Sequence, residues 1–254
     1  MKRATKKVFV GMSGGVDSSV AAYLLKKKGY EVIGIHLRCW NVGGCDEREA
    51  TDARLVANKL DIPFYVFDME EEYKRRVVDY MINGYKTGIT PNPDVMCNKE
   101  IKFGLFLEKA IAMGADYLAT GHYARNVEEG KKYFIYEGID KDKDQSYFLW
   151  TLDQNKLSKI LFPIGEYTKS EVRKIAKEAG LHVATKKDSQ GICFVGKVTL
   201  EEFLKGYLEE NEGAVLDTKG NVIGRHNGAH FYTIGQRHGL GVALNDPHYV
   251  VDKN

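Results

Sequence analysis

The sequence predicts an α/β protein: a doubly wound parallel sheet followed by a small β-rich domain. Short β-prone runs alternate with amphipathic helical segments through the first two-thirds of the chain. Connections of this length between strands favour right-handed crossovers, which cover a parallel sheet on both faces. From Gly213 onward, glycine becomes frequent and short β-prone pieces replace the helices.

Composition and charge are those of an ordinary folded protein. Of the 254 residues, 43% are hydrophobic and 28% are charged, which suits a sizeable core and excludes a disordered chain. The formal net charge of +2 gives no sign of nucleic-acid binding by bulk attraction, although a local basic groove is compatible with it. No apolar stretch approaches the roughly 18 residues that span a bilayer, so we expect no membrane association. Four cysteines without a secretory signal favour a reduced, cytoplasmic protein.

The expected elements of the first domain follow one another in a regular order. A β-rich run predicts a strand at Lys7–Met12, and apolar spacing predicts a helix at Val16–Lys28 that ends at Gly29. Glu31–Leu37 is the second expected strand. The pattern continues with helix Asp46–Leu60, strand Pro63–Asp68, helix Lys99–Met113 and strand Asp116–Thr120.

Two capping boxes open later helices. Thr168-x-x-Glu171 begins a helix that stops at Gly180, and Thr199-x-x-Glu202 begins another. Because the pattern of the sequence changes after these helices, we expect a first domain over residues 1–200 and a small β-rich domain over 201–254.

The most informative motif is Gly11-Met-Ser-Gly-Gly-Val-Asp-Ser-Ser19, between the first strand and the first helix. Ligands collect at the carboxyl ends of parallel strands, where a helix amino terminus offers unpaired N–H groups and a positive dipole end. Gly14 and Gly15 let the backbone turn tightly around an anion. Asp17 could hold a magnesium ion that bridges phosphate oxygens. The candidate phosphate-binding residues are Gly11, Met12, Ser13, Gly14, Gly15, Val16, Asp17 and Ser18.

Other phosphate loops fit this string less well. A Walker loop ends in Gly-Lys-Ser/Thr, and a dinucleotide fingerprint spaces its glycines differently. A lone Ser-Gly-Gly is more often a turn with a Ser or Asp helix cap. The full string resembles the PP-loop of the ATP pyrophosphatases, which implies that ATP is split to pyrophosphate while AMP is transferred to an oxygen.

Two segments place cysteines beside residues that could activate them. In Pro91–Phe103, Cys97 lies near the point where the chain enters a helix, and a thiol near a helix amino terminus has a lowered pKa. Asp94, just upstream, could exchange protons with a substrate. In Lys186–Gly196, Cys193 follows two lysines that favour a thiolate. Taken alone, each cysteine is more often an inert residue.

These segments, with further strings, make the chain similar to the tRNA-specific 2-thiouridylase family, which has the adenine nucleotide alpha hydrolase-like fold. The strings are Ala119–Ala124, Lys143–Phe148, Phe162–Gly165, Asp188–Phe194 and Thr233–Arg237. The resemblance implies that ATP adenylates the C2 oxygen of the wobble uridine of tRNA, and that sulfur from a cysteine persulfide then replaces this oxygen. It also implies a third, β-barrel domain, which is missing from the sequence up to Asn254.

The resemblance implies roles for individual residues. Cys193 would carry the persulfide, Cys97 would be the resolving thiol, and Asp94 would act beside them. The implied tRNA contacts are Asn92, Pro93, Asp94, His122, Lys143, Asp144 and Gln145, and the implied adenosine contacts are Gly121 and the backbone of Leu37. Sulfur would arrive from a cysteine desulfurase, directly or through a sulfur-carrier protein.

Three alternatives stay open. Related tRNA thiolases use iron–sulfur clusters, and Cys97, Cys193 and Asp94 could hold a [4Fe-4S] cluster. A PP-loop ligase acting on a small molecule would share the ATP loop without needing these cysteines, and a non-catalytic tRNA-binding protein would tolerate their loss. Cys39 and Cys45 have no zinc spacing, and the resemblance gives them no role.

Overall fold

The computed structural model describes residues 5–40, 46–188, 199–242 and 246–253. The chain forms two compact units. The first, here called the sheet unit, comprises Met1–Arg76 and Asp94–Gly196, and the second, the C-terminal unit, comprises Val77–Pro93 and Lys197–Asn254. The stretch Val77–Pro93 thus groups with the C-terminal unit although it precedes most of the sheet unit in sequence. The division of the chain into domains at residue 200 stays a prediction.

The sheet unit is built on five parallel strands, which confirms the predicted α/β class. From edge to edge they are β3 (Phe64–Asp68), β2 (Glu31–Arg38), β1 (Lys7–Gly11), β4 (Tyr117–Ala119) and β7 (Ile160–Leu161). The chain winds from central β1 toward β3, and then on the other side of β1 through β4 to β7. The carboxyl ends of β1 and β4 therefore form the topological switch point, where open α/β sheets bind ligands.

The other elements of this unit are helices and one hairpin. The longer helical elements are α1 (Val16–Lys27), α2 (Asp46–Lys59), η2 (Cys97–Phe106) and α8 (Lys169–Glu178). The shorter ones are α3 (Glu70–Tyr73), η1 (Lys74–Val78, which runs into the C-terminal unit), α5 (Pro93–Met96, which begins there), α6 (Leu107–Ala112), η3 (Ser146–Phe148), α7 (Gln154–Leu157) and η4 (His182–Thr185). The hairpin pairs β5 (Ala124–Glu129) with β6 (Lys132–Glu137). No helix among the described residues is both long and apolar enough to cross a membrane.

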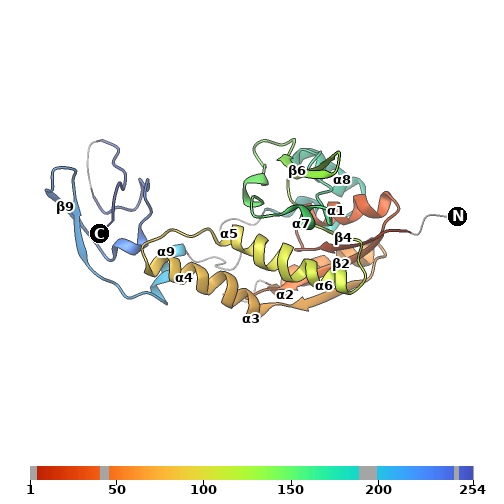
Figure 1. Cartoon of the computed structure of the whole chain (residues 1–254), viewed down its shortest axis with the longest axis horizontal. Helices are drawn as coiled ribbons and strands as arrows, with labels where there is room; N and C mark the ends of the chain where they lie inside the picture. The colour runs from red at the N-terminus through yellow and green to blue at the C-terminus, as the bar shows by residue number, and fades with distance from the viewer. Residues whose placement is uncertain (1–4, 41–45, 189–198, 243–245, 254) are drawn as a thin grey trace. The chain divides into compact units, whose positions relative to one another are not determined.

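Helices cover both faces of the sheet. Val8 and Val10 of β1 belong to a core shared with α1, α2 and α8. Phe9, between them, belongs to a second core shared with η2 and α6. This alternation follows from the two-residue period of a strand. Figure 1 shows α1 and α8 above the strands and α6 below them.

One helix begins earlier than the sequence predicts. Sequence patterns place its start near Cys97, whereas α5 begins at Pro93 and runs through η2 into α6. Proline is favoured at a first helical position because its ring fixes φ and the N–H group it lacks would have no helical partner there. Cys97 therefore lies in the second turn. It is also the first residue of η2, a π-helical segment, and such widened turns are frequent at functional sites.

The C-terminal unit contains a small antiparallel sheet, which agrees with the β-rich character that the sequence predicts for this region. Its elements are α4 (Asp79–Lys86), α9 (Leu200–Lys205), β8 (Gly213–Leu216), β9 (Val222–His226) and η5 (Ala229–Phe231). The turn between β8 and β9 is closed by Asp217, whose carboxylate accepts hydrogen bonds from the N–H groups of Lys219 and Asn221 at 2.8 Å each. The predicted capping box at Thr199 is present at the start of α9.

Removal of the Phe106 ring should destabilise the sheet unit. This fully buried ring meets Phe67 edge-on, with the ring centroids 5.9 Å apart. Phe106→Ala leaves a cavity and should lower the free energy of unfolding by about 3–5 kcal/mol, measured by urea denaturation. The control Phe134→Ala removes a ring that is 41% exposed and should cost less than about 1 kcal/mol. Equal losses in the two variants would contradict the core role of Phe106.

Candidate active site

The predicted phosphate loop crosses the switch point between β1 and α1, and β2 fixes its backbone. The N–H group of Met12 donates to the carbonyl oxygen of Ile35 at 2.7 Å. Nδ1 of His36, a buried residue, lies 2.9 Å from the carbonyl oxygen of Met12, so this nitrogen carries the proton. Within the loop, the N–H group of Ser13 donates to the hydroxyl oxygen of Ser18 at 3.1 Å. The shape of the loop is therefore set by the protein itself.

The amino terminus of α1 is left open to an anion. Its N-cap is Gly15, and among the described residues no side chain caps the helix. The hydroxyl of Ser19 donates instead to the carbonyl oxygen of Gly15 at 2.7 Å. The N–H groups of the first turn and the positive end of the helix dipole can therefore bind a negatively charged group. This geometry argues against the alternative of a simple turn with a Ser or Asp cap.

Two glycines are required by close backbone contacts around the loop. Gly14 has a φ of 72°, and a Cβ atom there would overlap the carbonyl oxygen of Glu49 in α2. Gly121 follows β4, and a Cβ atom on it would lie 2.6 Å from the backbone nitrogen of Ser18. The structure thus brings Gly121 against the phosphate loop. Leu37 lies near the end of β2, with its side chain packed against the second core.

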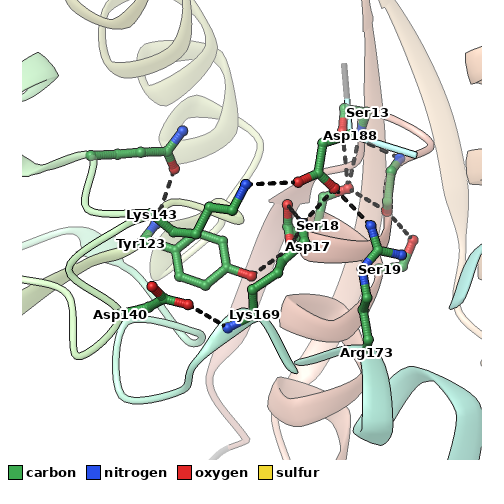
Figure 2. Close-up of polar contacts among 12 residues, drawn as sticks. Ser13, Asp17, Ser18, Ser19, Tyr123, Asp140, Lys143, Lys169, Arg173 and Asp188 are labelled. Atoms are coloured by element: carbon green, nitrogen blue, oxygen red, sulfur yellow. Dashed lines mark hydrogen bonds and ion pairs between the residues drawn. The ribbon is translucent and has the colours of Figure 1, made fainter. Parts of the chain in front are cut away.

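Two donors hold Asp17 in the first turn of α1 (Figure 2). Nζ of Lys169, at the start of α8, lies 2.8 Å from each carboxylate oxygen, and the hydroxyl of Tyr123 donates to Oδ1 at 2.8 Å. Burial raises the pKa of Tyr123, and the charge and hydrogen bond of Asp17 raise it further, so the phenol keeps its proton. These contacts orient a carboxylate of the kind that binds magnesium.

A second carboxylate, that of Asp188, shares Lys169 with Asp17. Oδ1 of Asp188 lies 2.7 Å from Nζ of Lys169 and 2.9 Å from Nη2 of Arg173, and Oδ2 lies 3.1 Å from Nζ of Lys143. Burial acts to raise the pKa of Asp188, but the hydrogen bonds and charges of Lys169 and Lys143 outweigh it and lower the pKa. Asp188 is therefore ionised at neutral pH, and its charge is compensated by three cations.

Lys186 contacts both the phosphate loop and α2. Its Nζ donates to the carbonyl oxygen of Gly14 at 3.1 Å and pairs with Asp52 at 2.6 Å. The sequence suggests that the lysines before Cys193 favour a thiolate. The contacts of Lys186 in the structure are to the loop and α2, and Cys193 lies outside the described residues.

Asp94 and Cys97 lie three residues apart along one continuous helix, so their side chains share a face. Burial raises the pKa of Asp94, and the charge of Lys102 acts in the opposite direction. A raised pKa brings this carboxyl group closer to the range in which general acids and bases work at neutral pH. The thiols of Cys97 and Cys39 are both half-buried.

His122 is buried, which the sequence does not reveal. Its ring packs against Phe103 and Phe162 with centroid distances of 5.7 and 5.8 Å, and Nδ1 lies 2.6 Å from the hydroxyl oxygen of Thr120. Burial, and next the charge of Lys102, lower the pKa of His122 well below its ordinary value, so the ring is neutral at pH 7. Contact of His122 with tRNA stays a prediction.

Lys143, Asp144 and Gln145 are neighbouring residues that are expected to bind tRNA. The last two form hydrogen bonds that stabilise their own loop. Asp144 accepts a hydrogen bond from the N–H group of Gly138 at 2.9 Å, and Gln145 accepts one from the N–H group of Tyr123 at 3.1 Å. The side chain of Lys143 remains 43% exposed although it is paired with Asp188. Its exposure leaves part of Lys143 accessible to a polyanion.

The structure leaves the roles of the remaining predicted residues as predictions. Cys193 and Cys45 lie outside the described residues. Asn92 and Pro93 belong to the C-terminal unit, and Asp94 begins the second segment of the sheet unit. Among the described residues, no three His, Cys, Asp or Glu side chains form a metal-binding group. The iron–sulfur alternative requires Cys193, so this finding does not test it.

The sequence patterns do not single out Tyr123, Lys169, Arg173 or Asp188 as site residues. Asp17 and Lys169 are 152 positions apart, and only the packing of α8 beside α1 brings them together. Tyr123 and Asp188 do lie in two of the strings that carry the family resemblance. Membership of these strings is the one signal in the sequence that could have identified them as site residues.

Comparisons with known proteins decide the family. A model described as the tRNA methyl transferase HUP domain matches residues 6–197, and one described as the tRNA methyl transferase PRC-barrel domain matches residues 201–254. The tRNA-specific 2-thiouridylase MnmA of Bacillus subtilis is 53% identical over 254 residues, which cover 98% of this chain and 68% of that protein. The chain belongs to the tRNA-specific 2-thiouridylase MnmA family. The family resemblance of the sequence is thereby confirmed.

Another MnmA relative, from Christiangramia forsetii, is 49% identical over 292 residues, which cover 97% of this chain and 74% of that protein. Among solved structures, the NMN synthetase from Francisella tularensis matches with a TM-score of 0.47 and 17% identity, over 79% of this chain and 72% of that one. A 4-thiouridine synthetase in complex with RNA and ATP matches with a TM-score of 0.45 and 18% identity, over 79% of this chain and 50% of that one.

A methyl group at Gly121 should weaken ATP binding by this MnmA-family chain. Gly121→Ala forces the first turn of α1 to shift, because the new Cβ atom would lie 2.6 Å from the backbone nitrogen of Ser18. We expect ATP affinity to fall at least about tenfold in calorimetry, which corresponds to about 1.4 kcal/mol. The control Gly130→Ala changes a hairpin turn with no atom within 4 Å of the added Cβ and should leave ATP affinity unchanged. Equal affinities for the two variants would argue against a nucleotide site beside Gly121.

Proposed function

We propose that the chain is a cytoplasmic, ATP-dependent tRNA sulfurtransferase that makes 2-thiouridine at the wobble position. The observation that carries this proposal is the 53% identity, over 98% of the chain, to a protein named tRNA-specific 2-thiouridylase. The open amino terminus of α1, with Asp17 in its first turn, supports the use of a nucleotide. The two matching family models are described by methyl transfer, but Cys97 and Cys193, in the segments that resemble the thiouridylases, favour sulfur chemistry.

The reaction requires both an activated oxygen and an activated sulfur. The C2 oxygen of uridine is a poor leaving group, so ATP first adenylates it and pyrophosphate is released. The terminal sulfur of a Cys193 persulfide then attacks C2, a C–S bond forms, and AMP leaves with the oxygen. The thiolate of Cys97 attacks the sulfur of Cys193, breaks the S–S bond and leaves the outer sulfur on C2. The resulting Cys97–Cys193 disulfide must be reduced by an external thiol before the next turnover.

Different residues would serve the two halves of ATP. The N–H groups of the phosphate loop and the first turn of α1 would bind the β and γ phosphates. Asp17, which Tyr123 and Lys169 orient, would supply a carboxylate oxygen of the kind that suits magnesium. When bound, magnesium supplies charge neutralisation on the phosphate oxygens. Gly121 and the backbone of Leu37 would border the adenosine.

The tRNA would be bound by two groups of residues. One group precedes η2 in the sequence, and the other follows β4. Its target base must leave the stack, because the reacting C2 edge is otherwise inaccessible. Asp94 would exchange a proton with this base. The further proposed tRNA contacts are Asn92, Pro93, His122, Lys143, Asp144 and Gln145. A cysteine desulfurase, acting directly or through a sulfur-carrier protein, would load the persulfide on Cys193.

The decisive experiment combines the full chain with ATP, magnesium, a persulfide source and unmodified tRNA. Thiolated tRNA is detected by retardation on a mercury-containing gel, and pyrophosphate release is measured in parallel. We expect a retarded product that depends on ATP. If neither thiolated tRNA nor pyrophosphate forms, the proposal is overturned. A thiolated product that forms only with iron-loaded, anaerobically purified protein would favour the iron–sulfur alternative.

Replacement of Cys193 should separate sulfur transfer from adenylation. Cys193→Ser removes the sulfur that carries the persulfide, so we expect loss of 2-thiouridine while pyrophosphate release stays within about twofold of the original rate. The matched control is Cys39→Ser, a cysteine with no role in the proposed reaction, and it should keep both activities. Undiminished thiolation by Cys193→Ser would remove the persulfide assignment.

Removal of the Lys102 charge should move the pH dependence of adenylation. Burial raises the pKa of Asp94 and Lys102 lowers it, so Lys102→Met should raise this pKa further. If ionised Asp94 is the base, pyrophosphate release falls at low pH, and the midpoint of this fall shifts to higher pH in the variant. Lys109→Met, which removes a lysine from the same continuous helix, is the control and should leave the midpoint in place. An unshifted midpoint in Lys102→Met would contradict the role of Asp94.

A further inference from the structure

Two large aromatic side chains are exposed on one short turn of the sheet unit. Tyr147 is 62% exposed, and Trp150, at 75%, is the most exposed large hydrophobic side chain among the described residues. Tryptophan is on average a highly buried residue, and exposed aromatic rings are enriched at binding surfaces. We call the segment Tyr147–Trp150 the aromatic turn.

The backbone presents both rings on the same side of the chain. The turn begins in the 3₁₀ helix η3, where the N–H group of Leu149 donates to the carbonyl oxygen of Ser146 at 3.0 Å. Residues three positions apart on such a turn eclipse each other, as Tyr147 and Trp150 do. Between them, Leu149 is only 1% exposed and belongs to the second core. The buried Leu149 therefore anchors the turn while the two rings face solvent.

Contacts within the segment restrict the aromatic turn before any ligand binds. The ring of Tyr147 packs against that of Phe148, with the centroids 4.1 Å apart. The hydroxyl of Ser146 donates to Asp144 at 2.8 Å, and the N–H group of Phe148 donates to the carbonyl oxygen of Gln145 at 3.1 Å. A preordered surface loses less conformational entropy when it binds a partner.

Hydrogen bonds connect the start of the aromatic turn to the phosphate loop. The N–H group of Gln145 donates to the carbonyl oxygen of Tyr123 at 2.9 Å, and the N–H group of Tyr123 donates to Oε1 of Gln145 at 3.1 Å. The hydroxyl of Tyr123 in turn donates to Asp17, as Figure 2 shows. The exposed rings thus follow directly on a residue that is bonded to the candidate active site.

The chemistry of this position fits unpaired nucleotides. In the proposed reaction the target uridine leaves its stack, so the neighbouring bases of a single-stranded loop lose a stacking partner. Exposed aromatic rings supply a replacement, and because every base has a π-face they do so with little regard to sequence. Lys143, 43% exposed and four positions before Tyr147, offers a cation to the phosphates between such bases.

We propose that the aromatic turn is a stacking surface for unpaired tRNA nucleotides that neighbour the target uridine, with Tyr147 and Trp150 each contacting a base. This inference rests on the proposed thiolation function and extends its tRNA contacts beyond Lys143, Asp144 and Gln145. Stacking is short-range and uncharged, so it holds the bases in place without adding to the positive charge of the site.

Removal of either ring should weaken tRNA binding without changing its salt dependence. Tyr147→Ala and Trp150→Ala should each lower the affinity for unmodified tRNA about tenfold in a filter-binding assay, because each variant loses the stacking of one base. The slope of log affinity against log salt concentration should stay the same, because no phosphate contact is lost. Tyr147→Phe and Trp150→Phe keep an aromatic ring and should retain most of the affinity.

Two further variants separate stacking from other effects. Tyr65→Ala removes a tyrosine that is 54% exposed on the edge strand β3 and has no part in the proposed contact, so we expect the original tRNA affinity. Lys143→Met should give the opposite pattern to ring removal, because loss of a phosphate contact reduces the salt slope by about one.

Fluorescence tests the contact of Trp150 directly. The chain contains two tryptophans, so Trp40→Phe leaves Trp150 as the only indole. Stacking of a base on this indole should quench its emission by at least about half at saturating tRNA. If an alanine variant has a lowered melting temperature, this measurement decides the matter, because Trp40→Phe leaves the aromatic turn intact.

Original tRNA affinity in both folded alanine variants, or undiminished Trp150 emission in a complex that filter binding shows to be formed, would overturn the inference. It would also be overturned if the alanine variants bind tRNA normally and lose only their binding to a cysteine desulfurase, since the surface would then serve a protein partner. Quenching by tRNA without formation of 2-thiouridine would instead reject the proposed function alone. Absence of any tRNA binding by the unaltered chain would overturn both.

Discussion

The geometry of the candidate site depends on the ammonium group of Lys169. It contacts both oxygens of Asp17 and one oxygen of Asp188, which uses all three of its N–H donors. Without this cation, the two carboxylates on one side of the site would lose the positive charge that they share. Partly buried ion pairs add little to stability because charged groups lose hydration. The arrangement is therefore better explained by the placement of charges than by stabilisation of the fold.

The position of Lys169 is in turn a consequence of helix packing. Val172 and Ala176 of α8 are fully buried in the core that also contains residues of α1. The capping box at Thr168 fixes the first turn of α8, where Lys169 lies. Because α1 begins at the phosphate loop, packing between these two helices sets the distance from Lys169 to Asp17. The same apolar contacts that stabilise the sheet unit thus also determine the electrostatics of the site.

Local features of the site could be predicted from the sequence, and contacts between distant segments could not. The glycine-rich string after β1 was recognisable because the turn and the helix start are encoded by neighbouring residues. The hairpin of β5 and β6 was not predicted, although Gly130 occupies its turn with a φ of 66°. The burial of His122 depends on Phe103 and Phe162, which approach it from two other segments. No periodicity in one segment encodes such a meeting.

The charge arrangement also explains how a chain with a net charge of +2 can suit two polyanions. Lys143, Lys169 and Arg173 face Asp17 and Asp188, so the cations and carboxylates of the site are gathered in one network. The pairs already restrict the long cationic side chains, so their conformational entropy is lost on folding rather than on binding. A phosphate group that approaches this edge of the sheet meets cationic side chains whose conformations are already restricted. The local placement of charges, rather than the total charge, is therefore the property that distinguishes this edge of the sheet.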